Sequence, residues 1–376
     1  MMRERATADA PVGWEKIHRV LLVRLRSIGD TVLMTPCLVA LKQWRPTLHL
    51  AVVSERLAAP VLEDHPAVDE VIVLDRQMNQ LRDTVERLRV ISTLRRQSYD
   101  LAVNLHGGPT AMVLTYLSGA PERLGYRGYR HGWMLTRRAP NPDVIWGKRP
   151  IHSVEQQIGL LKWAGLPIPT IPPTSLRVSE QALQSARRRL RHQGIRGPFA
   201  LIHPAATEES KRWSSHKFAQ VIKHLARCYD LPSVVIVARH EAHLAENIKG
   251  FAASAVHTMS DLNLKEVIAL AAQASLFIGN DSGPAHIAAA MRCPTIVIFG
   301  SSDPDVWRPW GPTPHVVVHV TSDPLGVRLP PAERIKHVRV EHVIEAVDRL
   351  LTTISVRDPA EAEAVGEVAQ HVASRG

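Results

Sequence analysis

Short apolar segments alternate with longer helix-like segments along both halves of this 376-residue chain. The apolar segments are rich in β-branched residues or Leu and end at polar or proline residues, as strands do. They predict strands at 19–25, 49–53, 70–74 and 100–105, and again at 199–203, 233–237, 275–279 and 294–299. Strands that alternate with helices form parallel sheets with helices on both faces. The predicted fold class is therefore α/β, with two doubly wound, Rossmann-like domains.

Composition narrows the classes of partner. The formal net charge of +10 suits an anionic partner, such as nucleic acid, an anionic lipid or a phosphorylated substrate. Nucleic acid is disfavoured because no binding module is recognisable and only 5% of residues are aromatic. A dinucleotide oxidoreductase is disfavoured because no Gly-x-Gly-x-x-Gly follows the first strand.

Other sequence features predict a cytoplasmic protein. No apolar run reaches the ~18 residues that a membrane span needs. Residues 1–14 lack the apolar core of a signal peptide. The three cysteines, Cys37, Cys228 and Cys293, are far apart and read as reduced thiols without metal-ligand spacing.

The segment 275–299 predicts a phosphate site. A strand leads into the turn Asn280-Asp281-Ser282-Gly283-Pro284, and a helix is predicted at 285–291. Asp281 or Ser282 suits the N-cap, Pro284 suits the first helical turn, and Gly283 allows close approach of a ligand. The free N–H groups of such a helix bind phosphate, and His286 faces the same place. The alternative is an ordinary capped turn of an α/β sheet.

Two further segments accompany this one in order. The first is Val20-Leu-Leu-Val-Arg-Leu-Arg-Ser-Ile-Gly-Asp30 followed by Thr31-Val-Leu-Met-Thr-Pro. The second is Leu201-Ile-His-Pro-Ala-Ala with Lys211-Arg212-Trp213 a few residues on. Together, the three resemble glycosyltransferase family 9, the heptosyltransferases of lipopolysaccharide core assembly, from about residue 19 to about residue 351.

The resemblance implies the GT-B architecture, in which two Rossmann-like domains face each other across a cleft. Prolines 167, 169, 172 and 173 form a natural linker between the two halves. We therefore expect an N-terminal extension at 1–18, an acceptor-binding domain at 19–172 and a nucleotide-sugar-binding domain at 173–340. A helix at 341–356 is expected to cross back onto the first domain, and 357–376 to form a flexible tail.

The resemblance also implies roles for individual residues. Asp30 corresponds to the proposed catalytic base, which an inverting transfer needs beside the acceptor hydroxyl. The alternative is that Asp30 is the N-cap of the next helix, and the two roles can coexist. Lys211 corresponds to a cation that binds the donor's phosphates and stabilises the departing diphosphate. Thr207 is a weaker candidate for phosphate contact, and Lys211 could instead be a solvated loop cation.

The nucleoside end of the donor is expected farther along the second domain. Glu241 matches the acid that holds the ribose hydroxyls, although a dipole-favoured Glu at a helix start is an equal alternative. Met259 is expected to wall the adenine pocket. The sequence departs from the family at Ala205, where Gly is usual, and at Ala238-Arg239, where a Gly pair is common. No cluster of residues with metal-ligand spacing is recognised, so we expect neither a metal nor another cofactor.

A basic stretch is the predicted acceptor surface. Between 123 and 142 the chain has arginines and aromatic residues but no acidic residue. Arginine suits phosphate or carboxylate groups, and aromatic faces suit sugar rings. The residues assigned to the acceptor are Arg123, Arg127, Arg130 and Arg137. The alternative is a solvated basic loop.

These observations predict an inverting, metal-independent glycosyltransferase. It would move a sugar, expected to be heptose from ADP-heptose, onto an anionic lipopolysaccharide core at the inner face of the inner membrane. The alternatives are a family 9 enzyme with another donor sugar and a nucleotide-sugar epimerase on the same fold. An epimerase would turn over a nucleotide sugar without an acceptor.

Overall fold

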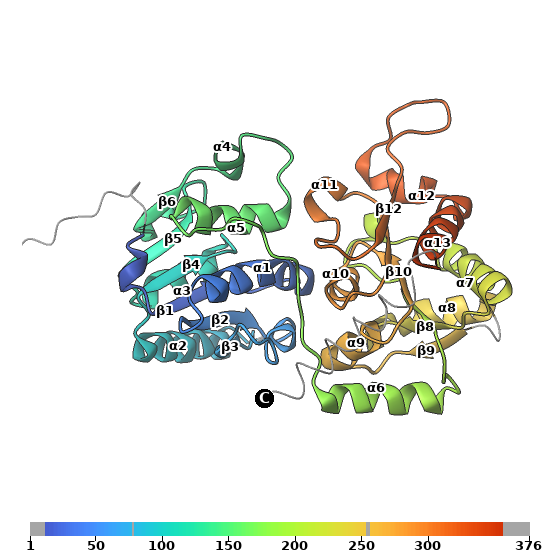
Figure 1. Ribbon diagram of the computed structural model, residues 1–376, viewed down its shortest axis with the longest axis horizontal. Coiled ribbons are helices and arrows are strands. Elements are labelled where there is room, and N and C mark those ends of the chain that lie inside the picture. Colours follow the sequence, from blue (N-terminus) through green and yellow to red (C-terminus); the bar gives the residue numbers. More distant parts are fainter. Residues whose placement is uncertain (1–11, 77–78, 253–255, 356–376) are drawn as a thin grey trace, which may run out of the picture.

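The computed structural model describes residues 12–76, 79–252 and 256–355 and places them in two α/β domains that lie side by side (Figure 1). Each domain contains a six-stranded sheet in which every neighbouring pair of strands is parallel. The predicted α/β class and the pair of Rossmann-like domains are confirmed.

The N-terminal sheet has the strand order β3-β2-β1-β4-β5-β6, so the chain reverses direction across the sheet next to β1. Leu22 of β1 lies opposite Val52 of β2 and Val103 of β4. Its strands are β1 (Arg19–Val23), β2 (His49–Glu55), β3 (Glu70–Leu74), β4 (Leu101–Asn104), β5 (Glu122–Tyr126) and β6 (Arg137–Ala139).

The C-terminal sheet has the order β12-β11-β10-β7-β8-β9. Ile278 of β10 lies between Ile202 of β7 and Ile296 of β11. Its strands are β7 (Ala200–His203), β8 (Ser233–Ile236), β9 (Val256–Met259), β10 (Leu276–Asn280), β11 (Thr295–Phe299) and β12 (His315–His319).

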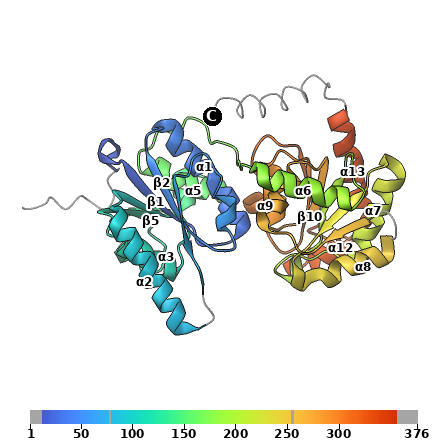
Figure 2. The same ribbon diagram turned by 90° about the horizontal axis from the view of Figure 1, so that it is seen from below.

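Helices cover both faces of each sheet (Figures 1 and 2). In the N-terminal half they are α1 (Ile28–Trp44), α2 (Gln80–Gln97), α3 (Pro109–Leu117), α4 (Pro142–Trp146) and α5 (Ser153–Trp163). In the C-terminal half they are α6 (Glu180–His192), α7 (Ser215–Tyr229), α8 (Ala242–Ala252), α9 (Leu264–Ala271), α10 (Gly283–Ala290), α11 (Pro304–Trp307), α12 (Arg334–His337) and α13 (Val340–Ser355).

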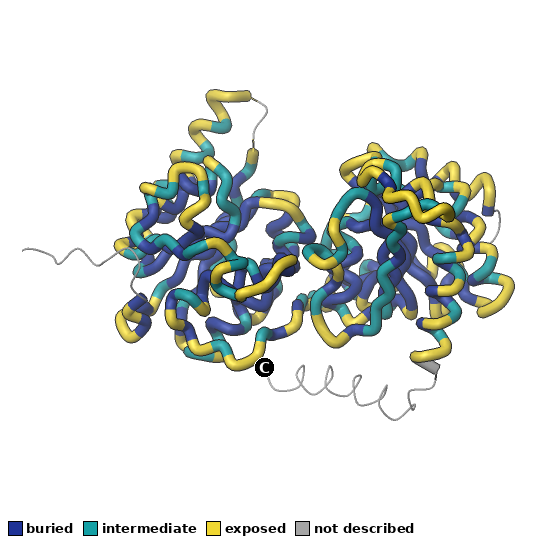
Figure 3. Tube along the Cα trace, turned by 90° about the horizontal axis from the view of Figure 1, so that it is seen from above, coloured by how far each residue is buried: buried dark blue, intermediate teal, exposed yellow. Residues whose placement is uncertain are grey.

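Burial explains why the central strands read as continuous apolar runs. In β1, Val20 and Leu22 belong to the core on one face of the sheet, and Leu21 and Val23 belong to the core on the other. All four side chains are fully buried. A sheet covered on both faces needs apolar residues at consecutive positions, as is usual in parallel sheets. The tube view shows this buried centre in both domains (Figure 3).

Four strands escaped the sequence prediction: β5, β6, β9 and β12. β5 and β6 carry Glu122, Arg123, Arg137 and Arg138, and β9 and β12 include histidines. β6, β9 and β12 are edge strands and β5 lies next to an edge, so each meets fewer apolar neighbours than the central strands. Because polar residues are tolerated at these positions, the strands lack the continuous apolar run by which the sequence predicts a strand.

The predicted crossing of the C-terminal helix is wrong for the described residues. α13 packs on α7, β11 and β12, and its apolar residues Val343, Val347 and Leu350 belong to the core of the C-terminal domain. The apolar stripe of the helix was recognised correctly, but it is buried on its own domain. The predicted tail at 357–376 lies outside the described residues.

The expected N-terminal extension is partly integrated into the first domain. Trp14 is buried, its ring meets Trp44 edge to face at 5.4 Å, and its indole N–H donates to the carbonyl of Ala164 at 2.8 Å. Residues 1–11 lie outside the described residues. The proline-rich segment that was expected to link the domains runs between α5 and α6 without a helix or strand of its own.

Candidate active site

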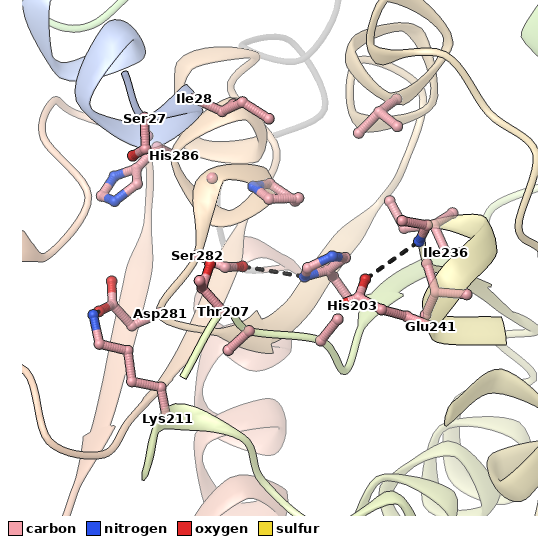
Figure 4. Close-up of a pocket in the computed structure, with 18 of the residues that line it drawn as sticks. Ser27, Ile28, His203, Thr207, Lys211, Ile236, Glu241, Asp281, Ser282 and His286 are labelled. Atoms are coloured by element: carbon pink, nitrogen blue, oxygen red, sulfur yellow. Dashed lines mark hydrogen bonds and ion pairs between the residues drawn. The ribbon is translucent and has the colours of Figure 1, made fainter. Parts of the chain in front are cut away.

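A cavity of about 680 Å³ opens between the domains at the carboxyl ends of the strands. The N-terminal domain contributes the start of α1, and the C-terminal domain contributes the loops after β7, β8 and β10 (Figure 4). In open α/β sheets, ligands bind in crevices at this edge, where the strand order reverses. The cavity is therefore the first place to look for a ligand site.

Asp30 enters the cavity from the first turn of α1. The predicted N-cap role belongs instead to Ser27, because the helix begins earlier than expected, at Ile28. Asp30 completes a capping box: its Oδ2 accepts from the Ser27 backbone N–H at 3.1 Å and from the Ser27 hydroxyl at 3.2 Å. Its Oδ1 forms an ion pair with the guanidinium of Arg24. The carboxylate is thus held in one orientation by the start of α1 and by Arg24, which directly follows β1.

The start of α10 faces the start of α1. Ser282 is the N-cap, but its hydroxyl bonds to His203 Nδ1 at 3.1 Å and to the Asn280 carbonyl at 3.1 Å rather than to the helix. Ser282, Gly283 and Pro284 all line the cavity, and Figure 4 labels Ser282. The positive end of the α10 dipole is therefore directed at the space where a ligand would lie.

Lys211 and Asp281 point toward each other beside this helix start (Figure 4). The Lys211 ammonium lies 3.2 Å from Asp281 Oδ2, and the Ser302 hydroxyl donates to the same oxygen at 2.5 Å. Asp281 is nearly buried, whereas Lys211 keeps about a quarter of its side chain exposed. Asp281 therefore positions the ammonium, and the ammonium is the group that a bound anion would meet.

Close packing of the two helix starts depends on two glycines. A Cβ on Gly29 would lie 2.8 Å from Cδ2 of His286, and a Cβ on Gly283 would lie 2.9 Å from Cβ of Ile28. Both distances are shorter than real Cβ atoms tolerate, so α1 and α10 meet backbone to backbone. His286 lies buried at this junction, and burial lowers its pKa although the charges of Asp281 and Asp30 oppose the shift.

The far end of the cavity is apolar. Ile236, Val237, Leu262, Leu264 and Val267 line it, and Glu241 stands among them. Glu241 Oε2 also accepts from the Ala238 backbone N–H at 3.4 Å. One carboxylate oxygen of Glu241 therefore caps the start of its own helical turn. Such a wall suits a flat nucleobase with a polar ribose at its edge.

Nine of the predicted site residues come together in this cavity and five do not. Those that line it are Asp30, Thr207, Lys211, Glu241, Asp281, Ser282, Gly283, Pro284 and His286. Met259 is 4% exposed in the hydrophobic core and does not line the cavity, whereas Leu262 and Leu264 do. The burial of Met259 follows from its position at the end of β9, under the sheet's helices.

The four arginines assigned to the acceptor lie outside the cavity. Arg123 donates to the carbonyls of Ala120 and Met134 at 2.7 and 2.8 Å, and Arg137 is 5% exposed and paired with Glu122 at 2.7 Å. These two fasten the loop between β5 and β6, because a buried guanidinium must satisfy its donors. Arg127 and Arg130 are exposed on that loop.

Sequence reasoning missed His203 and Trp307, which line the cavity, and Arg24 and Ser302, which hold its carboxylates from behind the lining. Arg24 orients Asp30, His203 holds Ser282, Ser302 donates to Asp281, and Trp307 reaches the cavity from α11. Arg24 and His203 stand within the segments that carried the family resemblance. Ser302 lies in the loop after β11 and Trp307 at the end of α11, and no local pattern marks them.

In the described parts of the chain, no group of three or more His, Cys, Asp and Glu side chains is arranged to hold a metal ion. Across the same residues, no helix combines the length and apolarity required to cross a membrane.

Comparisons with known proteins agree with this geometry. Residues 87–325 match the family model of glycosyltransferase family 9 (heptosyltransferase). Lipopolysaccharide heptosyltransferase 3 of Escherichia coli is 29% identical over 300 residues, covering 76% of this chain and 84% of the relative.

Two solved structures have the same fold. A glycosyl transferase family 9 protein from Veillonella parvula has a TM-score of 0.76 and 20% identity, with coverage of 89% of this chain and 97% of the other. E. coli ADP-heptose lipopolysaccharide heptosyltransferase II has a TM-score of 0.74 and 20% identity, with coverage of 90% and 100%. The two-domain architecture, the cavity between the domains and the family match lead to one conclusion: this chain is a glycosyltransferase and belongs to glycosyltransferase family 9, the heptosyltransferases.

Proposed function

We propose that the protein transfers heptose from ADP-heptose to a hydroxyl of a lipopolysaccharide core, with inversion at the anomeric carbon and without a metal ion. One observation carries the proposal. A carboxylate on the N-terminal domain, Asp30, faces a cationic helix start with Lys211 on the C-terminal domain, across one cavity. Sequence similarity to lipopolysaccharide heptosyltransferase 3 supports the choice of sugar and acceptor class.

The donor's diphosphate would lie at the start of α10. Breaking the glycosidic bond builds negative charge on the leaving diphosphate. The free N–H groups of α10 and the Lys211 ammonium are placed to stabilise that charge. When the diphosphate binds, the ion pair between Lys211 and Asp281 would weaken as the ammonium turns partly toward the phosphate. Because these groups are preorganised, they stabilise the transition state in the way that a metal would.

The acceptor hydroxyl would approach from the α1 side. Inversion requires the nucleophile to attack from the face opposite the leaving group, so the base and the phosphate site must stand on opposite sides of the sugar. The position of Asp30 and Lys211 on different domains that line one cavity supports such an arrangement. Asp30 removes the hydroxyl proton, and Arg24 keeps the carboxylate turned toward the cavity.

The nucleoside would occupy the apolar end. Leu262, Leu264 and Val267 would contact the adenine, and Glu241 would accept hydrogen bonds from the ribose hydroxyls. The protein would work at the inner-membrane surface, since a lipopolysaccharide core is anchored in lipid. The exposed arginines of α6, Arg187, Arg188 and Arg191, are suited to an anionic surface.

The decisive test is a panel assay of the purified protein. ADP-heptose and other nucleotide sugars are offered with and without heptose-truncated lipopolysaccharide, in buffer with EDTA. We expect product only with ADP-heptose and acceptor, in the α configuration if the donor is β, and equal rates with and without EDTA. Turnover of donor without acceptor would identify an epimerase, and a preference for another nucleotide sugar would show that heptose is not the transferred sugar. Loss of activity in EDTA would refute the metal-free mechanism.

A further inference from the structure

The C-terminal end of α7 brings a thiol, an imidazole and a carboxylate into one row of contacts. Sγ of Cys228 lies 3.6 Å from Nδ1 of His224, and Nε2 of the same ring lies 2.8 Å from Oδ1 of Asp348. Cys228 and His224 are four residues apart and share one face of α7, and Asp348 comes from α13, which packs on α7 (Figure 1). Metal ligands would converge on one point, whereas here the imidazole separates the sulfur from the carboxylate.

Asp348 determines which nitrogen of His224 carries the proton. An ionised carboxylate only accepts hydrogen bonds, so Nε2–H donates to Oδ1 and Nδ1 presents its lone pair to the thiol. Desolvation alone would raise the pKa of Asp348, but hydrogen bonds from His224 and from the Tyr229 hydroxyl lower it, so the carboxylate is ionised at pH 7. A neutral imidazole held in this way can take up the thiol proton, and the carboxylate stabilises the imidazolium that forms.

Access to solvent separates Cys228 from the other two cysteines. Cys37 and Cys293 are buried, and burial raises the pKa of both thiols. Cys228 is exposed, whereas only 14% of the His224 side chain beside it is exposed. A reagent can therefore reach the sulfur while the base stays sheltered. The C-terminal end of a helix disfavours a thiolate, so ionisation of Cys228 depends on the positive charge of the imidazolium.

We propose that Cys228 is a covalent modification site, at which a low-molecular-weight disulfide forms a mixed disulfide with the protein. His224 Nδ1 takes the proton from the thiol, and Sγ attacks one sulfur of the reagent. The S–S bond of the reagent breaks as the new S–S bond forms, and the departing thiolate takes the proton back from the imidazolium. One protein thiol and one disulfide thus give one mixed disulfide and one small thiol.

A disulfide suits this site because the same imidazole serves both halves of the exchange, first as a base and then as an acid. The site is independent of the proposed sugar transfer, since Cys228, His224 and Asp348 do not line the cavity between the domains. Failure of one proposal therefore leaves the other intact.

Labelling of the full-length protein tests whether the site reacts. The reduced protein is mixed with an excess of glutathione disulfide at pH 7, and a protease digest is analysed by mass spectrometry. We expect a glutathione adduct at Cys228 that dithiothreitol removes, while Cys37 and Cys293 react only after unfolding. No adduct at Cys228, or faster labelling of either buried cysteine in the folded protein, would overturn the proposal.

A rate comparison tests whether His224 activates the thiol. The reagent is dipyridyl disulfide, which is neutral, so that loss of the histidine charge does not change its attraction to the protein. Since an ordinary thiol is only a few per cent thiolate at pH 7, full ionisation gives up to ~30-fold more thiolate, and the lower nucleophilicity of a stabilised thiolate reduces the gain to ~3- to 10-fold. His224→Gln, which can still donate to Asp348 but cannot take up the proton, should lose that factor.

The control for this comparison is His216→Gln, because His216 is an exposed histidine of the same helix that contacts Gln220. It should react as fast as the wild type, and Cys228→Ser should abolish the reaction of the folded protein. Equal rates in folded His224→Gln and in the wild type would show that Cys228 is merely exposed, which would overturn the proposal.

Discussion

Asp30 directs one carboxylate oxygen to the capping box of α1 and the other to the guanidinium of Arg24. The capping bonds stabilise the helix, and the ion pair orients the group in the cavity. Oδ2 therefore serves the cap of the helix, whereas the ability of the carboxylate to take up a proton serves the proposed chemistry. An amide can accept the capping bonds, but it cannot take up a proton from the acceptor.

Asp30→Asn is expected to lower kcat by ~10²–10⁴-fold, which is the scale of a lost general base. The Kd for ADP should change little and the capping acceptor remains, but the melting temperature should fall because the buried Arg24 loses its carboxylate partner. The control is Asp100→Asn, since Asp100 accepts from the backbone N–H groups of His18 and Arg19 far from the cavity. Normal turnover in Asp30→Asn would leave the residue with only its capping role.

Lys211→Ala should weaken ADP binding by ~10- to 100-fold, the value of a hydrogen bond to a charged group of about 1.5–3 kcal/mol. Added Mg²⁺ should not restore binding, because Asp281 and the α10 start form no metal site of their own. Calorimetry with ADP measures the effect, and Lys223→Ala on exposed α7 is the control. Unaltered ADP affinity would place the diphosphate elsewhere in the cavity.

At the scale of elements, α1 and α10 bring the two domains together at their N-terminal ends. The contact is possible because Gly29 and Gly283 present bare backbone to the opposite helix. The same arrangement aims both helix dipoles into the cavity. A change in the spacing of these helices therefore alters the distance between the base and the phosphate site.

Gly29→Ala should lower kcat/KM by at least ~10-fold through displacement of His286 and of the α1 start. The overpacking is expected to cost about 1–3 kcal/mol of the free energy of unfolding. Gly197→Ala is the matched control, because a Cβ there meets nothing within 4 Å and its φ is not positive. Wild-type kinetics in Gly29→Ala would show that the helices can separate without consequence.

At the scale of the whole molecule, two buried histidines connect separate parts of the chain. His65 Nδ1 accepts from the Ala67 N–H, so its Nε2–H is left to donate to the Ser175 hydroxyl in the interdomain segment at 3.2 Å. His152 Nδ1 accepts from the Val154 N–H, and its Nε2–H donates to the Arg308 carbonyl of the other domain at 2.8 Å. Burial lowers the pKa of each to about 4.

Stability should therefore fall in mild acid. Both histidines are neutral in the folded protein, whereas in the unfolded chain they take up protons below pH ~6.5. Their contribution to the free energy of unfolding is complete above that pH and is lost as the pH falls toward 4. Melting temperatures between pH 7 and 5 measure the loss. His152→Asn, which can still cap α5, should reduce the slope, whereas His192→Asn on the exposed face of α6 should not; equal slopes would contradict the assignment.

The sequence alone determined the class of fold and most of the candidate site. Central strands are buried on both faces, so they appear in the sequence as continuous apolar runs. The capping residues of the turn at 280–284 predict the start of a helix. The α10 residues were found from the capping chemistry of their turn, whereas Asp30 and Lys211 were found because their segments resemble those of glycosyltransferase family 9. Edge strands such as β6 were not predicted because they pair with only one other strand and can carry polar side chains.

Only the tertiary structure decided how distant segments meet. It paired Arg137 with Glu122 and buried Met259, which removed them from the lining. It also brought Trp307 to the cavity, Arg24 to Asp30 and Ser302 to Asp281. It also docked α13 on its own domain. Local sequence carries the periodicity of an element and the chemistry of its ends. Which charge finds a partner, and which face is covered, depends on contacts between residues far apart in the chain, and those contacts exist only after the sheets and helices have packed.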